Sequence, residues 1–161
     1  MQHPSPKEEV TLAYLVGLRS AMRAGEILSL GKSTLDLERR VAEVKHKMQY
    51  LTGRPRQVPL TRHASRLLRP VAQRERCFSI MAASQDTLFR KSRDRLLIED
   101  LHFHDSRAEA LTRLSRSTLL PSKDQRPQGF APFAGGPLPR ISGTNCGAFI
   151  ARILGEKCRS I

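Results

Sequence analysis

A histidine and an arginine stand three residues apart in the segment HDSR (104–107). Residues at this spacing at the start of a helix project from one side of it, so His104 and Arg107 can both reach one phosphate group. The imidazole would assist proton transfer or hydrogen-bond the phosphate, and the guanidinium would bind two of its oxygens in forked geometry. A purely structural interpretation stays open, in which His104 caps the helix and Arg107 is a solvated charge.

A second pair of charged residues that could act together is Arg23 and Glu26, in the segment MRAGE (22–26). Arg23 is predicted at the start of a short helix, where a cation opposes the helix macrodipole, so another benefit must hold it there. The alternative is an ordinary surface arginine. We expect Glu26 to orient a basic side chain, the alternative being that it only stabilises the first helical turn.

The charge balance indicates the kind of partner. The 161 residues carry 28 Lys and Arg against 15 Asp and Glu, a formal net charge of +13. Such an excess favours a polyanion, because each phosphate neutralised by Lys or Arg releases condensed counterions. Nucleic acid is therefore predicted. A solvated basic surface and an anionic membrane face are alternatives, although no basic amphipathic helix with a Trp or Phe stripe supports the membrane.

Several classes of protein are excluded by what the chain lacks. No stretch approaches the roughly 20 consecutive apolar residues that a membrane span needs, and the N-terminus has no features of a secretion signal. We therefore expect a cytoplasmic protein without a membrane partner. The cysteines at 77, 146 and 158 form no C-x-x-C pair, which argues against a zinc site and a disulfide framework. No metal and no cofactor are predicted.

The periodicity of the first 60 residues predicts a helical start followed by a small sheet. Ser5 and Glu8 have the spacing of a capping box for a helix over 6–22, and a short helix over 24–30 follows. The pattern then becomes typical of strands, in LDL (35–37), VAEVKHK (41–47) and RQVPL (56–60). Three antiparallel strands are expected.

Helices are predicted again after the sheet, so that the expected fold class is α+β and mainly helical. The first runs over 62–73 and is interrupted near Pro70. The second runs over 84–97, with Ser84 as its N-cap and an apolar side of Leu88, Phe89, Leu96 and Leu97. The third runs over 105–116, with a core-facing stripe of Ala108, Ala110, Leu111 and Leu114.

Three blocks occur in order along the chain, namely AMRAGEILSL (21–30), TGRPRQVPLT (52–61) and LHFHDSRAEALTRL (101–114). Together they resemble the catalytic domain of tyrosine recombinases, the phage integrase family, and within it the shufflon-type DNA invertases. The resemblance covers roughly residues 10–116. It implies a site-specific recombinase that breaks and rejoins double-stranded DNA, with other recombinase protomers as further partners.

The resemblance also implies roles for individual residues. Arg23 and Arg107 would bind the non-bridging oxygens of the scissile phosphate and stabilise the charge of its transition state, with His104 beside them. His102 falls one residue too early for the H-x-x-R motif, and we interpret it as structural or as a contact to the DNA backbone.

The family places a lysine on the hairpin between the second and third strands, where it protonates the leaving 5′ oxygen. Counting without gaps lands on Leu51, which cannot donate a proton. If the hairpin is longer, Lys47 is the candidate, with Lys45 on the same strand face two residues earlier. The alternative is that Lys47 contacts phosphate and affects affinity only.

The family's nucleophile is a tyrosine after the H-x-x-R block, which forms a 3′-phosphotyrosyl bond with DNA. This sequence has only Tyr14 and Tyr50, both upstream of that block, and it lacks the family's G-H box. Phosphotyrosyl chemistry is therefore not assigned to this chain. An inactive recombinase fragment is expected. A non-catalytic basic DNA-binding module and a tyrosine donated by a neighbouring chain are the alternatives.

Residues 117–161 differ in composition from the rest, with five Pro and six Gly in under a third of the chain. We expect 1–116 to be a partial tyrosine-recombinase catalytic domain and 117–161 to be an out-of-frame, disordered tail. Residues 123–153, back-translated with permitted codons and read one nucleotide later, spell KISGHRDLRLLLEVHYRESQEQIAARL. That string resembles the missing G-H box and tyrosine helix, so we hypothesise a frameshifted recombinase remnant.

Overall fold

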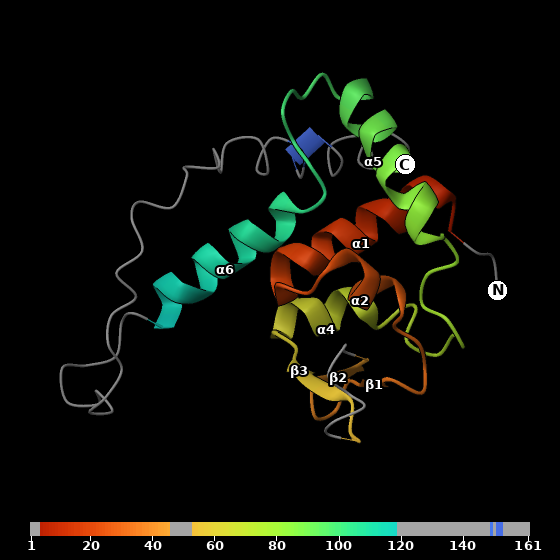
Figure 1. Cartoon of the computed structure of the whole chain (residues 1–161), viewed down its shortest axis with the longest axis vertical. Helices are drawn as coiled ribbons and strands as arrows, with labels where there is room; N and C mark the ends of the chain where they lie inside the picture. The colour runs from red at the N-terminus through yellow and green to blue at the C-terminus, as the bar shows by residue number, and fades with distance from the viewer. Residues whose placement is uncertain (1–3, 46–52, 119–148, 150, 153–161) are drawn as a thin grey trace.

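The first helix is the centre of the molecule. The computed structural model describes residues 4–45, 53–118, 149 and 151–152, with 115–118 described in backbone only (Figure 1). Helix α1 spans Pro6–Ser20 and packs against α2, α4, α5 and α6. The predicted capping box is confirmed, because Glu8 N–H donates to Ser5 Oγ at 3.4 Å and Ser5 N–H donates to Glu8 Oε2 at 2.9 Å.

A turn at Ala21 links α1 to the next helix. Ala21 has a left-handed φ of 56°, and its N–H donates to the Gly17 carbonyl, which closes the last turn of α1. Helix α2 then spans Ala24–Leu28, with Arg23 at its N-cap. This turn is short and buried at Ala21 and Met22, so it holds the start of α2 against the end of α1.

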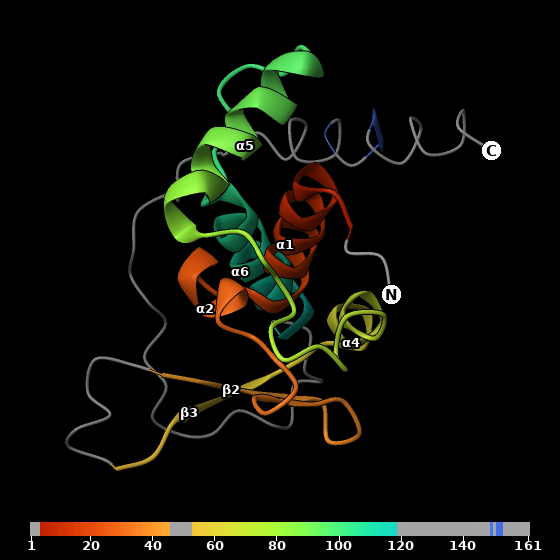
Figure 2. The same cartoon turned by 90° about the vertical axis from the view of Figure 1, so that its right-hand side faces the viewer.

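The predicted three-stranded antiparallel sheet is confirmed. Its strands are β1 (Leu35–Asp36), β2 (Val41–Val44) and β3 (Arg56–Pro59), in the order β1-β2-β3. In β2 the side chains alternate, with Ala42 and Val44 buried and Glu43 exposed, as the period of two in VAEV requires. Figures 1 and 2 show the sheet at one end of the helical body, next to α4.

Two helices follow the sheet. Helix α4 spans Arg62–Leu68 and begins at Thr61, whose hydroxyl accepts from Ala64 N–H at 3.2 Å. Helix α5 spans Ala82–Arg95. The prediction that Ser84 caps α5 is wrong, since the N-cap is Met81 and makes no side-chain cap bond. Leu97 is also not on the buried side, because it follows the end of α5 in a left-handed conformation and is 85% exposed.

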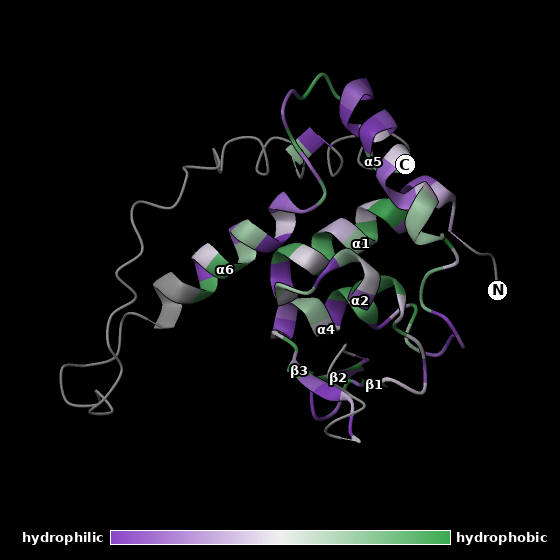
Figure 3. Cartoon of the chain, in the orientation of Figure 1, coloured by the Kyte–Doolittle hydropathy of each residue, from purple (hydrophilic) through white to green (hydrophobic). Residues whose placement is uncertain are grey.

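The last long helix, α6, spans Asp105–Thr118, close to the predicted bounds. Its first turns lie against α1, and its C-terminal half projects beyond the helical body in Figure 1. Ala110 is buried as predicted. Leu111 and Leu114 are 48% and 38% exposed, so the predicted core-facing stripe is wrong at these two positions, which lie on the projecting half. Figure 3 shows apolar residues interspersed with hydrophilic ones along α6.

Four aromatic rings form the centre of the core between α1, α5 and α6. Tyr14 stacks on Phe89 with ring centroids 4.9 Å apart, and Phe103 meets Tyr14 edge-on at 5.7 Å. Phe149, from a short helical segment near the C-terminus, contacts Tyr14 at 4.9 Å and is itself buried. Most of residues 117–161 lies outside the described residues, so the expected boundary and disordered tail stay predictions.

Candidate functional site

The side chain of Arg107 is fixed to the turn between α1 and α2. Its Nη1 donates to the carbonyl of Ala21, the C-cap of α1, and the side chain is half-buried. A guanidinium is stabilised at this place, because the last carbonyls of a helix lack partners and carry the negative end of its dipole. Arg107 is therefore held by the fold, and no second hydrogen-bond partner of its guanidinium is found among the described residues.

Arg23 lies two residues beyond that contact, at the N-cap of α2. Its side chain is 62% exposed, and its Nη1 is 3.4 Å from Glu26 Oε1. The α1–α2 turn thus brings Arg23 and Arg107 to one end of α1, although 84 residues separate them in sequence. Sequence spacing alone does not decide this proximity. It depends on the packing of α6 against α1.

Glu26 joins two basic side chains and caps its own helix. Its Oε2 accepts from the backbone N–H of Arg23 at 2.8 Å, and its Oε1 is 2.6 Å from Nη2 of Arg56 on β3. The side chain of Glu26 is only 12% exposed. Sequence reasoning missed Arg56. Only the position of β3 relative to α2 reveals it, since the pair is 30 residues apart.

His104 and His102 both stand beside the start of α6. His104 is exposed, and its carbonyl accepts from Arg107 N–H at 3.0 Å. Among the described residues its imidazole makes no hydrogen bond; Asp105 closes this turn instead, by accepting from His102 N–H at 2.7 Å. The imidazole of His102 lies 3.7 Å from the same carboxylate and is 63% exposed. The alternative in which the His104 side chain caps α6 therefore finds no support.

The hairpin lysine and the tyrosines complete the set of predicted residues. Lys47 lies outside the described residues, and Lys45 is exposed directly after β2. Tyr14 is 0% exposed, inside the aromatic cluster of the core, so a DNA phosphate cannot reach its phenol. Tyr50 lies outside the described residues.

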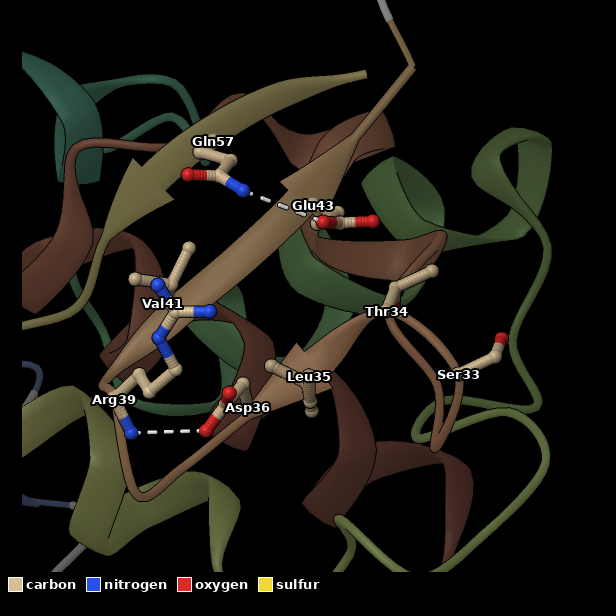
Figure 4. Close-up of a pocket in the computed structure, with 8 residues that line it drawn as sticks. All are labelled: Ser33, Thr34, Leu35, Asp36, Arg39, Val41, Glu43 and Gln57. Carbon is tan, nitrogen blue, oxygen red and sulfur yellow. Dashed lines mark hydrogen bonds between the residues drawn. The ribbon is translucent and has the colours of Figure 1, made fainter. Parts of the chain in front are cut away.

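A pocket of about 150 Å³ opens on the sheet, and neither Arg23 nor Arg107 lines it (Figure 4). Its charged side chains are Asp36, Glu43 and Arg39, and its uncharged polar ones are Ser33, Thr34 and Gln57. Gln57 Nε2 donates to Glu43 Oε1 at 3.4 Å, and Arg39 N–H donates to Asp36 Oδ1 at 2.8 Å. Two carboxylates against one guanidinium disfavour a phosphate ligand, so the pocket adds nothing to the arginine site.

Two features are missing from the described part of the chain. No helix there is long and apolar enough to span a membrane. No group of three or more His, Cys, Asp or Glu side chains there could hold a metal ion.

Cys77 is buried, and this burial raises the pKa of its thiol to about 11, against an opposing effect of the nearby Arg74. That thiol is a core group and not a nucleophile.

The α+β architecture, a helical body with a three-stranded antiparallel sheet, is consistent with the family that comparison with known sequences gives. Residues 3–126 match the phage integrase family, and the chain belongs to that family. It is 39% identical over 114 residues to a Haemophilus influenzae protein classed as an integrase/recombinase, and 38% identical over 112 residues to the shufflon-specific DNA recombinase of Escherichia coli.

These alignments cover only part of each relative. They include 68% and 66% of this chain but 36% and 28% of the two relatives, so the chain spans about a third of their length. No solved structure matches the chain.

Proposed function

We propose that this chain carries the phosphate-binding part of a site-specific DNA recombinase, and that it binds double-stranded DNA without forming the covalent intermediate. The observation that carries this proposal is the contact of Arg107 with the turn that ends at Arg23. Two guanidiniums at one end of α1, in a chain of net charge +13, suit a phosphodiester. The names of the relatives support DNA as the substrate.

Each residue of the site has a role in this proposal. Arg23 and Arg107 bind the non-bridging oxygens, and Glu26 orients Arg23 toward them. The exposed imidazole of His104 hydrogen-bonds the phosphate or assists proton transfer. Lys47, or Lys45 in its place, would protonate the leaving 5′ oxygen. The proposed chemistry uses neither a metal nor ATP.

Binding is proposed to be separate from cleavage, because no tyrosine among the described residues is placed to attack a phosphate. Tyr14 is enclosed in the core, and no tyrosine follows Arg107 in this chain. A nicked suicide substrate, which traps a 3′-phosphotyrosyl adduct, is the direct test. We expect salt-sensitive binding and no adduct on a denaturing gel. An adduct formed by the chain alone would overturn the proposal.

A second candidate function is a basic DNA-binding module without a recombinase partner, favoured by the charge alone. Mixing the chain with a recombinase that keeps its tyrosine but has lost its own phosphate-binding arginines separates the two, because that partner forms no adduct alone. Adduct that appears on the mixture, and disappears when Arg107 of this chain is replaced by Ala, indicates a recombinase site completed by a neighbouring chain. Binding that never leads to adduct in any mixture favours the module.

The boundary near residue 116 and the frameshift belong to the same proposal. The family match ends at residue 126, which leaves most of the Pro- and Gly-rich segment outside it. Sequencing the gene and reading all frames through codons 110–161 tests the hypothesis. An intact frame encoding a G-H box and a tyrosine would support it, and a gene without such a frame would contradict it.

A further inference from the structure

A row of arginines on α4 stands apart from the site described above. Arg62, Arg66 and Arg69 are all exposed and follow each other at intervals of four and three residues, so they lie on one side of the helix. Ala64 and Leu68, on the opposite side, are 0% exposed and pack into the core. We call the three arginines the α4 basic stripe. The stripe faces solvent, because the opposite side of α4 is buried in the core.

Carboxylates do not neutralise this stripe. The other arginines of helices α2, α5 and α6 often lie beside a carboxylate, as Arg90 lies 3.2 Å from Asp86 and Arg113 lies 2.7 Å from Glu109. Within the described part of the chain, no ion pair or hydrogen bond joins the stripe side chains to a partner, and the α4 segment RHASRLL has no acidic residue. Three like charges without counter-charges favour an anionic ligand.

The stripe begins at the same end of α1 as the two-arginine site. The Thr61 hydroxyl, at the start of α4, donates to the Arg19 carbonyl at 2.8 Å, and Arg19 is in the last turn of α1. Two residues later, the Ala21 carbonyl accepts from Arg107. Figure 2 shows α4 on the flank of α1 away from α5. The stripe therefore starts near the proposed phosphate site and leads away from it.

The length of the stripe suits a DNA strand. From Arg62 to Arg69 the helix rises about 10 Å, at 1.5 Å per residue. A strand of duplex DNA presents one phosphate per roughly 3.4 Å of axis, so this length corresponds to about three phosphates. We infer that the α4 basic stripe is a second DNA contact, which holds the backbone of the duplex flanking the phosphate at Arg23 and Arg107. This inference rests on the proposed function, and it concerns positioning without base recognition.

The experiment compares three variants of the full chain by fluorescence anisotropy on duplexes of unrelated sequence. The stripe variant is R62Q/R66Q/R69Q. Its matched control is K7Q/K32Q/R76Q, which removes the same charge at exposed positions elsewhere. The third is Arg107→Ala, which reports on the proposed site. Circular dichroism and thermal unfolding verify that each is folded, and single substitutions replace the triple variant if it is not.

We expect the stripe variant to lower the salt slope by up to roughly 2.7 in log-log terms, about 0.9 for each lost phosphate contact, on every duplex sequence. The control should change the slope by much less. Equal effects of stripe and control variants would overturn the inference even if Arg107→Ala still weakens binding. If Arg107→Ala leaves DNA binding unchanged while the stripe variant weakens it, the result would contradict the proposed site and not this inference. Loss of binding to phosphatidylserine vesicles, with DNA binding unchanged, would assign the stripe to a membrane and overturn the inference.

Discussion

The carboxylate of Glu26 and the guanidinium of Arg56 lie 2.6 Å apart, which joins the start of α2 to strand β3. The same carboxylate accepts the backbone N–H of Arg23. One side chain thus links Arg23, at the N-cap of α2, to strand β3.

Replacing Glu26 by Ala should therefore cost more stability than replacing Arg56 by Ala. The first change removes the N-terminal cap of α2 as well as the ion pair, a loss of about 1–2 kcal/mol. The second removes a pair whose arginine is 42% exposed, worth at most about 1 kcal/mol after solvent screening. Urea unfolding of both single variants and the double variant measures the coupling. Strictly additive effects would show that the pair contributes nothing.

Arg107→Ala should flatten the salt dependence of DNA binding by roughly one unit, because one phosphate contact is lost. The effect should be the same for unrelated duplex sequences, since phosphate contacts carry no sequence information. Arg113→Ala is the matched control on the same helix, because Arg113 is paired with Glu109 at 2.7 Å. If the two variants behave alike while folded, the phosphate is not bound at Arg107.

Gly17 determines how closely α6 approaches α1. A Cβ added at Gly17 would lie 2.6 Å from Oγ of Ser106, and that hydroxyl is buried and donates to the Phe103 carbonyl at 2.7 Å. Gly17→Ala should lower the free energy of unfolding by roughly 1–3 kcal/mol through overpacking. The better helix propensity of Ala offsets about 1 kcal/mol of this loss. It should also weaken DNA binding, because α6 carries Arg107. Partial recovery of both in Gly17→Ala with Ser106→Gly would locate the clash, and a neutral Gly17→Ala would exclude it.

Glu9 anchors the segment that leads into α5. It is 1% exposed, and its Oε2 accepts from Ser79 N–H at 2.7 Å, Ser79 Oγ at 2.9 Å and Ile80 N–H at 3.2 Å. Glu9→Ala should lower the free energy of unfolding by about 2–4 kcal/mol, because buried donors lose a charged acceptor. Ser79→Ala, which keeps both backbone donors paired, should cost less. Thermal unfolding ranks the two, and the reverse order would contradict the assignment.

Cys77 gives a testable pH dependence. Burial raises the pKa of its thiol from 9.0 to about 11, so the folded state holds the proton more tightly than the unfolded state. This contribution to stability is complete below pH 9 and is lost as the pH rises through 11. Its size is about 2–3 kcal/mol, since each unit of difference between the folded and unfolded pKa is worth about 1.36 kcal/mol. The free energy of unfolding, measured in urea from pH 8 to 11, should decline less steeply for Cys77→Ala than for the parent chain. Parallel profiles of parent and variant would rule out this role.

The sequence by itself determined the elements and their types. The Ser5–Glu8 capping box and the alternation in 41–44 are local, so hydrogen bonds and periodicity within a few residues specify them. It also determined that no tyrosine follows Arg107. The end of α5 was harder to predict, because Leu97 is apolar but its left-handed backbone turns it to solvent.

Only the tertiary structure decided which distant side chains meet. Arg107 reaches the Ala21 carbonyl because α6 packs on α1 at Gly17, and Arg56 reaches Glu26 because β3 passes beside α2. The enclosure of Tyr14 by Phe89 and Phe103 was likewise decided by packing. Such contacts join residues 30 to 90 positions apart, and their free energy depends on burial and direction in space, which no local pattern encodes.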